Sequence, residues 1–219
     1  MIPDADQAAR RCASLQSLFA LAPVVPVVTI EDAAHAVPLA RALSRGGLRA
    51  IEITLRTAAG LDAARAIRAE VPEAIVGIGT VLTPQDLERS IDAGAAFALS
   101  PGATSELLDA ARALELPFIP GVQTASELMA CVTRGFGIVK FFPAVPAGGI
   151  SAIRALAGPF PQVRFCPTGG ISERDARAWL AEPNVVAVGG SWIAPRRAVL
   201  AGAWDEIEAL ARAAATLMR

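Results

Sequence analysis

The sequence predicts an α/β fold, a single (β/α)8 TIM barrel over residues 1–219 with an extra helix before its first strand. Eight short apolar runs start roughly 21 to 26 residues apart, and segments with helical patterning lie between them. Strands that alternate with helices form βαβ units and therefore a parallel sheet. Because no linker or low-complexity segment interrupts these units, a closed barrel is favoured over an open sheet.

The extra helix is expected from Ala5 to Leu21, where the apolar residues follow an amphipathic pattern. Each of the following runs is short and apolar, as is typical of strands that are buried on both faces of a parallel sheet. The runs expected as strands are Val24–Val28, Ala50–Ile53, Ala74–Val76, Ala96–Leu99, Pro117–Ile119, Ile138–Phe141, Val163–Cys166 and Val185–Val188.

Helices are expected between these runs, and several carry signals for a helix start. Thr83 precedes Pro84 and is followed by Asp86, while Thr104 and Ser172 each precede a helical segment. Hydroxyl side chains at such positions accept hydrogen bonds from free backbone N–H groups of the first turn. The expected helices include Ala58–Glu70, Pro84–Ala93, Ser105–Leu114, Thr124–Thr133 and Glu173–Leu180.

A doubly wound open sheet is the competing fold. Such a sheet usually has a glycine-rich phosphate loop after its first strand, and residues 29–32 contain no glycine. The third run ends with Gly77 and Gly79, but the third glycine of a dinucleotide fingerprint is missing at the required spacing. The barrel is therefore the preferred prediction.

Composition excludes several classes of function. Hydrophobic residues make up 53% of the chain and aromatic residues only 5%, so Ala, Val, Leu and Ile must form the core of an α/β protein. The net charge of −1 and the pI near 5.9 give no basic footprint for nucleic acid or an anionic membrane. The longest apolar stretch, residues 18–28, contains two prolines and is too short to span a bilayer. The start of the sequence lacks a basic n-region, so we expect a cytoplasmic protein.

The cysteines and the single histidine argue against a zinc centre, and we expect no cofactor. Cys12, Cys131 and Cys166 are odd in number and have no C-x-x-C spacing, which favours three separate thiols in a reducing compartment. His35 lies in a helical segment, where a packing role is expected, and one histidine cannot build a zinc site of two or three histidines. A carboxylate-bound magnesium stays open, although no clustered acidic motif indicates one.

Lys140 is the only lysine in the sequence and ends an apolar run that continues into Phe141 and Phe142. A neutral amine can attack a carbonyl group, whereas a guanidinium stays protonated. Retention of one lysine among arginines, in an apolar segment, therefore favours a Schiff-base lysine. The alternative is a lysine that extends from a strand end to water.

The second run continues with polar residues on alternate positions. Alternation places Glu52, Thr54 and Arg56 on the face opposite to Ile51 and Ile53. In a barrel, catalytic groups lie at the carboxyl ends of strands. Glu52 is therefore a candidate general acid/base and Arg56 a candidate anion-binding cation; a structural ion pair between the two is the alternative.

Two Gly-Gly loops follow the last two runs, at residues 168–170 and 189–191. Loops after the seventh and eighth strands of a barrel commonly bind phosphate through backbone N–H groups. Together the loops predict a phosphorylated substrate. The Pro-Gly turns at residues 101–102 and 120–121 would also allow a ligand to approach the backbone, or serve as plain turns.

These motifs together resemble one family. From Pro23 to Trp192 the chain is similar to the 2-keto-3-deoxy-6-phosphogluconate (KDPG) aldolase and 4-hydroxy-2-oxoglutarate aldolase family of class I pyruvate aldolases. No single motif is specific, but the set is. The motifs that carry the resemblance are Glu52–Thr57, Gly77–Thr80, Ser100–Gly102, Lys140–Pro143 and Arg164–Ser172.

The resemblance implies a Schiff-base aldolase that cleaves 2-dehydro-3-deoxy-6-phosphogluconate to pyruvate and D-glyceraldehyde 3-phosphate, in the Entner–Doudoroff pathway. It implies Lys140 as the Schiff-base residue, Glu52 as general acid/base, and a metal-free homotrimer. Residues implied to bind the substrate are Arg56, Thr80, Pro101, Lys140 and Thr168, and those implied to bind its phosphate are Gly169, Gly170, Gly189, Gly190 and Ser191.

The surroundings of Lys140 bear on the chemistry, and the loop after it bears on the substrate. Lys140 is expected to be neutral because Val139, Phe141 and Phe142 desolvate it and Arg56 repels its charge. The family often has Glu and a polar residue after Ala144, whereas this chain has Val-Pro-Ala at 145–147, so the aldehyde preference stays open. Rival functions are cleavage of 4-hydroxy-2-oxoglutarate, isomerisation of a sugar phosphate, and non-catalytic binding of a phosphometabolite.

Overall fold

The computed structural model describes residues 13, 15, 17–19, 23–114 and 116–217. Most of the helix expected from Ala5 to Leu21 lies outside the described residues, and its five described positions are helical. Within the described part of the chain, no helix has both the length and the apolar character needed to cross a membrane.

Strands and helices alternate along the chain, as predicted. The strands are β1 (Val24–Val28), β2 (Ala50–Thr54), β3 (Ile75–Gly79), β4 (Phe97–Leu99), β5 (Phe118–Ile119), β6 (Gly121–Val122), β7 (Ile138–Phe141), β8 (Arg164–Pro167) and β9 (Val188–Gly190). The helices are η1 (Ala33–His35), α2 (Ala36–Arg45), α3 (Gly60–Glu70), α4 (Pro84–Asp92), α5 (Ser105–Ala113), α6 (Ala125–Val132), α7 (Gly149–Ala157), α8 (Glu173–Leu180), α9 (Arg196–Leu200) and α10 (Trp204–Ala215).

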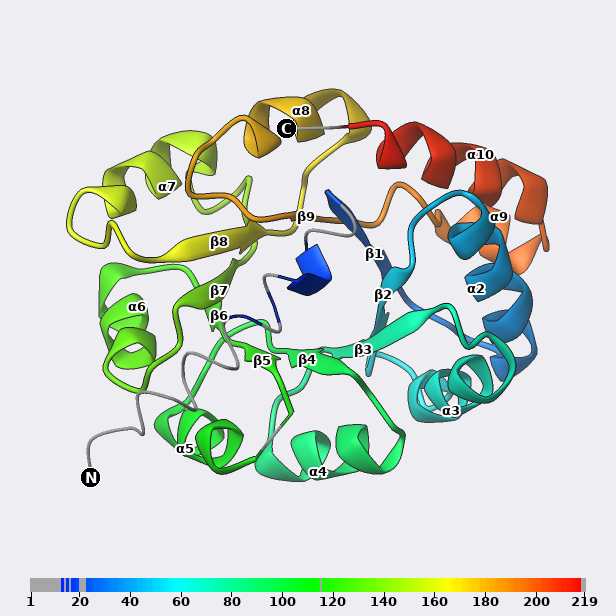
Figure 1. Cartoon of the computed structure of the whole chain (residues 1–219), viewed down its shortest axis with the longest axis horizontal. Coiled ribbons are helices and arrows are strands. Elements are labelled where there is room, and N and C mark those ends of the chain that lie inside the picture. Colours follow the sequence, from blue (N-terminus) through cyan, green and yellow to red (C-terminus); the bar gives the residue numbers. More distant parts are fainter. Residues whose placement is uncertain (1–12, 14, 16, 20–22, 115, 218–219) are drawn as a thin grey trace.

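The strands form curved, entirely parallel sheets. One sheet has six strands in the order β5-β4-β3-β2-β1-β9, and the other has three in the order β6-β7-β8. The strands surround the centre of the molecule and the helices form an outer layer (Figure 1). The prediction of a parallel α/β fold is confirmed.

Three predicted strands differ from the observed ones. The third run, expected to end at Val76, continues as β3 to Gly79. The fifth run extends beyond Ile119, and Pro120, which has no N–H, divides it into β5 and β6. The last strand begins later than predicted: β9 starts at Val188 and includes two glycines. Glycine has a low strand propensity, but pairing with β1 overrides it: Gly189 lies opposite Val25 in the ladder.

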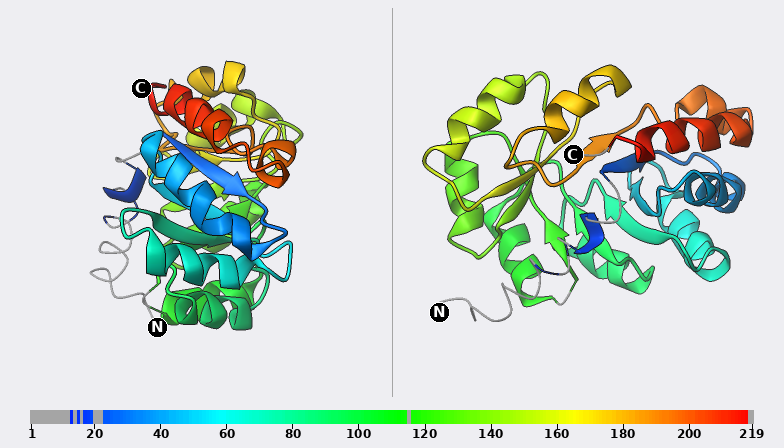
Figure 2. Two further views of the ribbon diagram at one scale, coloured as in Figure 1. Left: turned by 90° about the vertical axis from the view of Figure 1, so that its right-hand side faces the viewer. Right: turned by 45° about the horizontal axis from the view of Figure 1, so that its top comes forward.

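The sheets lie between two separate cores, one on each face. Ile51 and Ile53 belong to the core beneath the helices, whereas Ala50 belongs to an inner core with Phe97 and Leu99. The inner core also contains Leu15, Leu18 and Phe19 of the extra helix. The described residues of this helix lie at one end of the strands (Figure 2), so they close the inner core at the amino ends of the strands.

The predicted helix starts are largely confirmed. The Thr83 hydroxyl accepts from the Asp86 N–H and the Asp86 carboxylate accepts from the Thr83 N–H, which makes a capping box at α4. At the start of α5, the Thr104 hydroxyl accepts a hydrogen bond from the Leu107 N–H. Ser172 is the first residue before α8, but its hydroxyl donates to the Asp175 carboxylate instead of accepting from the backbone.

The stability that the capping box contributes should depend on pH through the Asp86 carboxylate. Burial raises the pKa of Asp86, but hydrogen bonds from the Leu82 N–H, Arg89 and Thr83 outweigh burial and hold that pKa below its usual range. The stabilisation by the ionised Asp86 carboxylate is therefore complete above the pKa that an Asp has in the unfolded chain. It is lost as the pH falls through the lower pKa of Asp86 in the folded protein. Asp86→Asn should lower the free energy of unfolding by about 1 kcal/mol at pH 7 in urea titrations. A difference that persists unchanged to pH 2 would contradict this explanation.

Candidate active site

The centre of the site is a buried contact between Lys140 on β7 and Glu52 on β2. The Lys140 Nζ lies 2.8 Å from the Glu52 Oε1, although the two residues are 88 positions apart in sequence. Their side chains are 5% and 1% exposed. An amine and a carboxylate at this distance share a hydrogen-bonded proton, so proton transfer between them needs no rearrangement.

The structure corrects the expected surroundings of Lys140. Its neighbours along the strand, Val139 and Phe141, belong to the core beneath the helices and point away from it. The charged group in contact with Lys140 is the Glu52 carboxylate, which attracts the ammonium. The predicted proximity to Phe142 is confirmed, because Nζ lies 5.5 Å from the centre of that ring.

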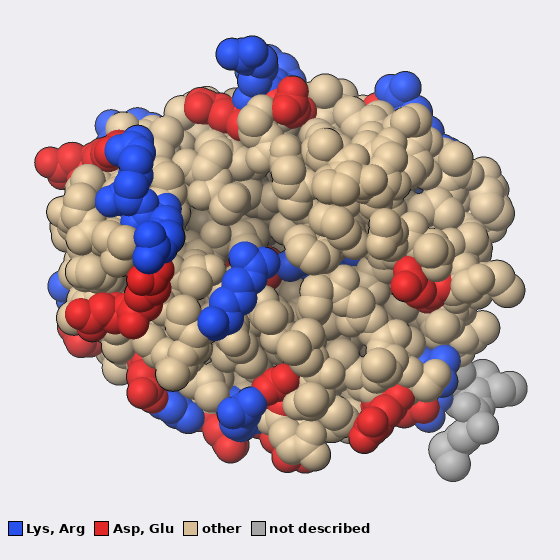
Figure 3. All heavy atoms as spheres, turned by 180° about the vertical axis from the view of Figure 1, so that it is seen from behind, with Lys and Arg blue, Asp and Glu red and all other residues tan. Residues whose placement is uncertain are grey.

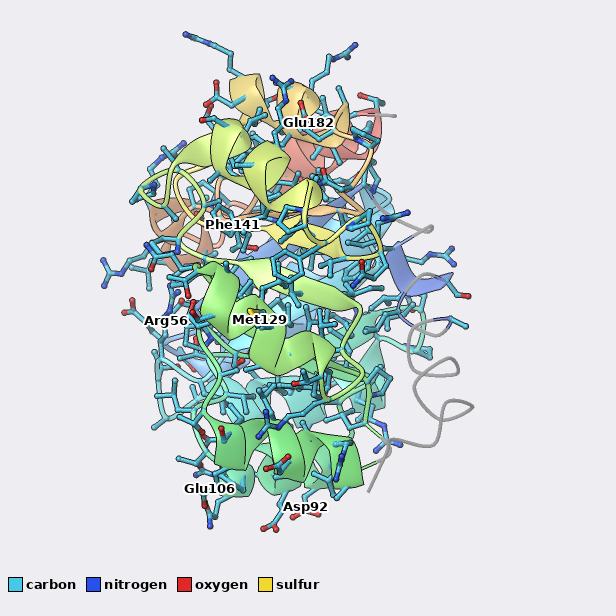
Figure 4. All side chains as sticks on the ribbon, turned by 90° about the vertical axis from the view of Figure 1, so that its left-hand side faces the viewer. Arg56, Asp92, Glu106, Met129, Phe141 and Glu182 are labelled. Atoms are coloured by element: carbon cyan, nitrogen blue, oxygen red, sulfur yellow. The ribbon has the colours of Figure 1, made fainter. Side chains whose placement is uncertain are left out.

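Arg56 lies beyond the end of β2 and is exposed. It is on the side of the molecule away from the extra helix (Figure 4). Seen from that side, the surface has a central hollow, with a basic side chain lying across it (Figure 3). The structure does not support an ion pair between Glu52 and Arg56, since the Glu52 carboxylate binds Lys140.

The other polar residue on this face of β2 has a structural role. The fully buried Thr54 hydroxyl donates to the Val28 carbonyl at 3.1 Å and lies 3.0 Å from the Thr29 hydroxyl. Because a hydroxyl has one proton, Thr29 must be the donor in the second contact. These bonds connect β1 to β2 just beyond Glu52 and fix the strand that carries it.

The two Gly-Gly loops lie next to each other. Thr168 forms a parallel bridge with Gly189, and a Cβ on Gly189 would lie 2.2 Å from the Thr168 Oγ1. Gly169 and Gly170 have φ values of +103° and +80°, a conformation that favours glycine. The predicted grouping of the loops after the last two strands is therefore present in the structure.

The members of these loops are not equally accessible. Ser191 and Gly170 are exposed, whereas Gly190 is buried and a Cβ there would lie 2.1 Å from the Trp192 ring. Gly190 thus makes room for an indole. Pro101, at the end of β4, is half-buried and its carbonyl packs against Gly121.

Cys166 adjoins the site and was not predicted to do so. It is the β8 register partner of Lys140, and both residues occur on the inner face. Burial raises the pKa of its thiol to about 12, an effect that Lys140 opposes and Glu52 increases. Cys166 is therefore a neutral thiol near the ion pair and a poor nucleophile at neutral pH. Residues two apart in a strand lie on the same face, so the polar Thr168 could have indicated that Cys166 also faces the site.

The described residues contain no group of three or more His, Cys, Asp and Glu side chains placed to hold a metal ion. Cys131 and Cys166 are free and buried, as predicted, and Cys12 lies outside the described residues. The His35 ring contacts the Trp204 ring edge-on at 5.7 Å, which agrees with a packing role.

Residues 15–210 match the family model described as "KDPG and KHG aldolase". The chain belongs to this aldolase family. A "KHG/KDPG aldolase" of Escherichia coli K12 is 53% identical over 201 residues, which cover 92% of this chain and 94% of that protein. A "2-dehydro-3-deoxy-phosphogluconate aldolase" of Pseudomonas aeruginosa is 45% identical and covers 94% of this chain and 93% of its own length.

Solved structures of KDPG aldolases have the same fold as this chain. The enzyme from Legionella pneumophila, solved with pyruvate captured at low pH as a covalent carbinolamine intermediate, matches with a TM-score of 0.90 and 45% identity. That match covers 92% of this chain and 98% of the Legionella chain. The Zymomonas mobilis ZM4 aldolase, solved with 3-phosphoglycerate, matches with a TM-score of 0.87 and 42% identity, and covers 100% of this chain and 98% of its own.

Thr80, directly after β3, has a strained backbone. Its φ of +62° is the one positive value among the described residues other than glycine, and a β-branched side chain disfavours it. Such strain costs about 1 to 3 kcal/mol and is concentrated at functional sites.

Thr80→Gly should therefore keep or raise the free energy of unfolding, by up to about 1 kcal/mol, because strain relief offsets the larger entropy of the unfolded chain. Urea titration measures the change. Thr133→Gly is the matched control, since Thr133 ends α6 with an ordinary φ of −63° and should lose stability. A comparable loss in both variants would show that Thr80 is unstrained.

Proposed function

We propose that the protein is a Schiff-base aldolase that cleaves 2-dehydro-3-deoxy-6-phosphogluconate to pyruvate and D-glyceraldehyde 3-phosphate. The observation that carries this proposal is the buried 2.8 Å contact between the sequence's only lysine and a carboxylate. Relatives at 45–53% identity, with names that include KDPG aldolase and 2-dehydro-3-deoxy-phosphogluconate aldolase, support the substrate.

The first step is formation of the imine. Glu52 accepts a proton from Lys140, and the freed amine attacks the C2 ketone of the substrate. Glu52 then returns a proton to the carbinolamine oxygen, which leaves as water and produces an iminium. The covalent carbinolamine with pyruvate in the Legionella aldolase supports this route.

The second step breaks the carbon–carbon bond. The C4 hydroxyl gives its proton to the Glu52 carboxylate, its oxygen forms the aldehyde carbonyl, and the electrons of the C3–C4 bond move to the iminium. Glyceraldehyde 3-phosphate leaves, and an enamine remains on Lys140. Protonation of C3 followed by addition of water releases pyruvate and restores the amine. Glu52 is the buried acid/base next to this nitrogen.

The groups of the substrate can be assigned to particular residues of the site. We assign the carboxylate end of the substrate to Arg56 and Thr80, and Pro101 and Thr168 are assigned as further residues that line the substrate. The phosphate is assigned to the paired loops of Gly169, Gly170, Gly189, Gly190 and Ser191. The side-by-side placement of these loops supports the assignment. The Zymomonas aldolase was solved with 3-phosphoglycerate, which supports a phosphorylated ligand for the family fold.

We propose further that the two sheets close into one eight-stranded barrel and that the chain is a single domain. β5 and β6 then form one strand interrupted at Pro120. Parallel bridges between Phe165 and Val185 and between Thr168 and Gly189 connect β8 to the segment of β9. The homotrimer that the family resemblance implies and the cytoplasmic location stay predictions.

Activity on 4-hydroxy-2-oxoglutarate is the second candidate, because the Escherichia coli relative is named "KHG/KDPG aldolase". Both substrates would use the same imine chemistry at Lys140. Comparison of kcat/KM on the two keto acids separates a preference for the phosphorylated substrate from an enzyme that serves both.

Imine trapping tests the proposal directly. Borohydride reduction in the presence of pyruvate should add one pyruvyl-derived mass, and peptide mapping should place it on Lys140. The mapping is unambiguous, because the only other amine in the sequence is the amino terminus. Lys140→Arg should give no adduct and no cleavage, since a guanidinium cannot form the imine. Full activity of Lys140→Arg, or an adduct only at the amino terminus, would exclude the mechanism.

Ser191→Glu tests the phosphate assignment. A carboxylate in the paired loops would repel the phosphate and compete for the backbone N–H donors, so KM for the phosphorylated keto acid should rise at least tenfold. Exchange of pyruvate methyl protons should change little, because pyruvate has no phosphate. Thr216→Glu adds the same charge at the end of α10 and serves as control. Equal losses in both assays would indicate general damage, and an unchanged KM would place the phosphate elsewhere.

A further inference from the structure

Two glycines on β3 face the inner side of the sheet, next to the strand that carries Glu52. Gly77 and Gly79 alternate with Val76 and Ile78, which belong to the core beneath the helices. In the ladder between β2 and β3, Gly77 lies directly opposite Glu52. Gly79 is two residues nearer the carboxyl end of its strand, which is the end where catalytic groups of such folds lie.

A different side chain occupies the space over each glycine. A Cβ on Gly77 would lie 2.2 Å from the ring of Phe97. A Cβ on Gly79 would lie 2.0 Å from the Glu52 Oε1 and 2.6 Å from the Glu52 Cδ. Cβ contacts under 3.0 Å are essentially never observed, so either methyl group would force its neighbour to move.

These two contacts explain where the carboxylate lies. Phe97 fills the space directly opposite Glu52, and the Glu52 side chain lies instead over Gly79. The oxygen that would meet a Gly79 methyl group is Oε1, the same atom that accepts the hydrogen bond from Lys140. Displacement of this oxygen would therefore break the contact with Lys140.

We propose that Gly79 is a positioning residue for the aldolase reaction, because the space above it holds the Glu52 carboxylate against Lys140. This role rests on the proposed function, in which Glu52 exchanges protons with that amine. Backbone conformation does not explain the glycine, since Gly79 is not among the described glycines with a positive φ. An alanine can adopt this backbone, and its effect must come from the methyl group alone.

Gly79→Ala should lower kcat for cleavage and the rate of pyruvate proton exchange by at least tenfold, and at most by the roughly 10² to 10⁴ that a positioned acid/base contributes. KM should change less than kcat, because the methyl group displaces a proton-transfer group. The decisive comparison is made without the carboxylate. Glu52→Ala removes the group that the methyl would meet, so Gly79→Ala should not reduce the residual activity or the melting temperature of Glu52→Ala any further.

Gly77→Ala is the matched control on the same strand. Its methyl group would meet the Phe97 ring, so it should lower the melting temperature and leave the turnover of the folded fraction near that of the parent. A tenfold or larger loss of turnover in Gly77→Ala would show that any bulk on β3 disturbs the site, and that Gly79 has no special role.

The remaining outcomes also decide the proposal. Parental kcat in Gly79→Ala overturns it, as does an equal fractional loss of activity with and without the Glu52 side chain. If Gly79→Ala does not fold, the double variant Glu52→Ala/Gly79→Ala decides: folding at the melting temperature of Glu52→Ala supports the steric contact, and failure to fold overturns it. Borohydride trapping on the parent protein tests the imine mechanism separately.

Discussion

The buried contact between Lys140 and Glu52 is the interaction on which the rest of the structure depends. Removal of an ammonium and a carboxylate from water costs several kcal/mol for each ion, and only good geometry offsets that cost. The geometry comes from β7 and β2, which belong to different sheets. Any change that moves either strand leaves a buried charge unpaired, so the arrangement of the sheets and the chemistry of the site are coupled.

The inner face of the sheets changes in character along the strands. At the amino ends, Leu15, Leu18 and Phe19 of the extra helix pack with the inner apolar residues. At the carboxyl ends, the polar Glu52 and Lys140 are buried on the same face. The apolar part excludes water from beneath the ion pair, which strengthens its electrostatic interaction. The hollow in the surface lies on the side of the molecule away from the extra helix (Figure 3).

Glycines fulfil two different tasks around this site. Gly79 and Gly189 make room for the side chains of Glu52 and Thr168. Gly170 supplies a left-handed backbone conformation after β8, and Gly190 makes room for the Trp192 ring. Their shared feature is the missing Cβ, but its consequence depends on the neighbour. The space over Gly79, Gly189 and Gly190 is occupied by a carboxylate, a hydroxyl and a ring, respectively.

The sequence by itself determined the order of strands and helices, the helix starts at Thr83 and Thr104, and the choice of Lys140 as the candidate for the reactive amine. These features depend on local periodicity, on side chains within a few residues, and on amine chemistry, all of which can be read along the chain. Only the tertiary structure decided which carboxylate meets Lys140, that Val139 and Phe141 point away from it, and that Cys166 adjoins it. The start of β9 at Val188 also depended on pairing with β1. These features arise from contacts between residues far apart in sequence, where the position of one strand against another determines which atoms meet.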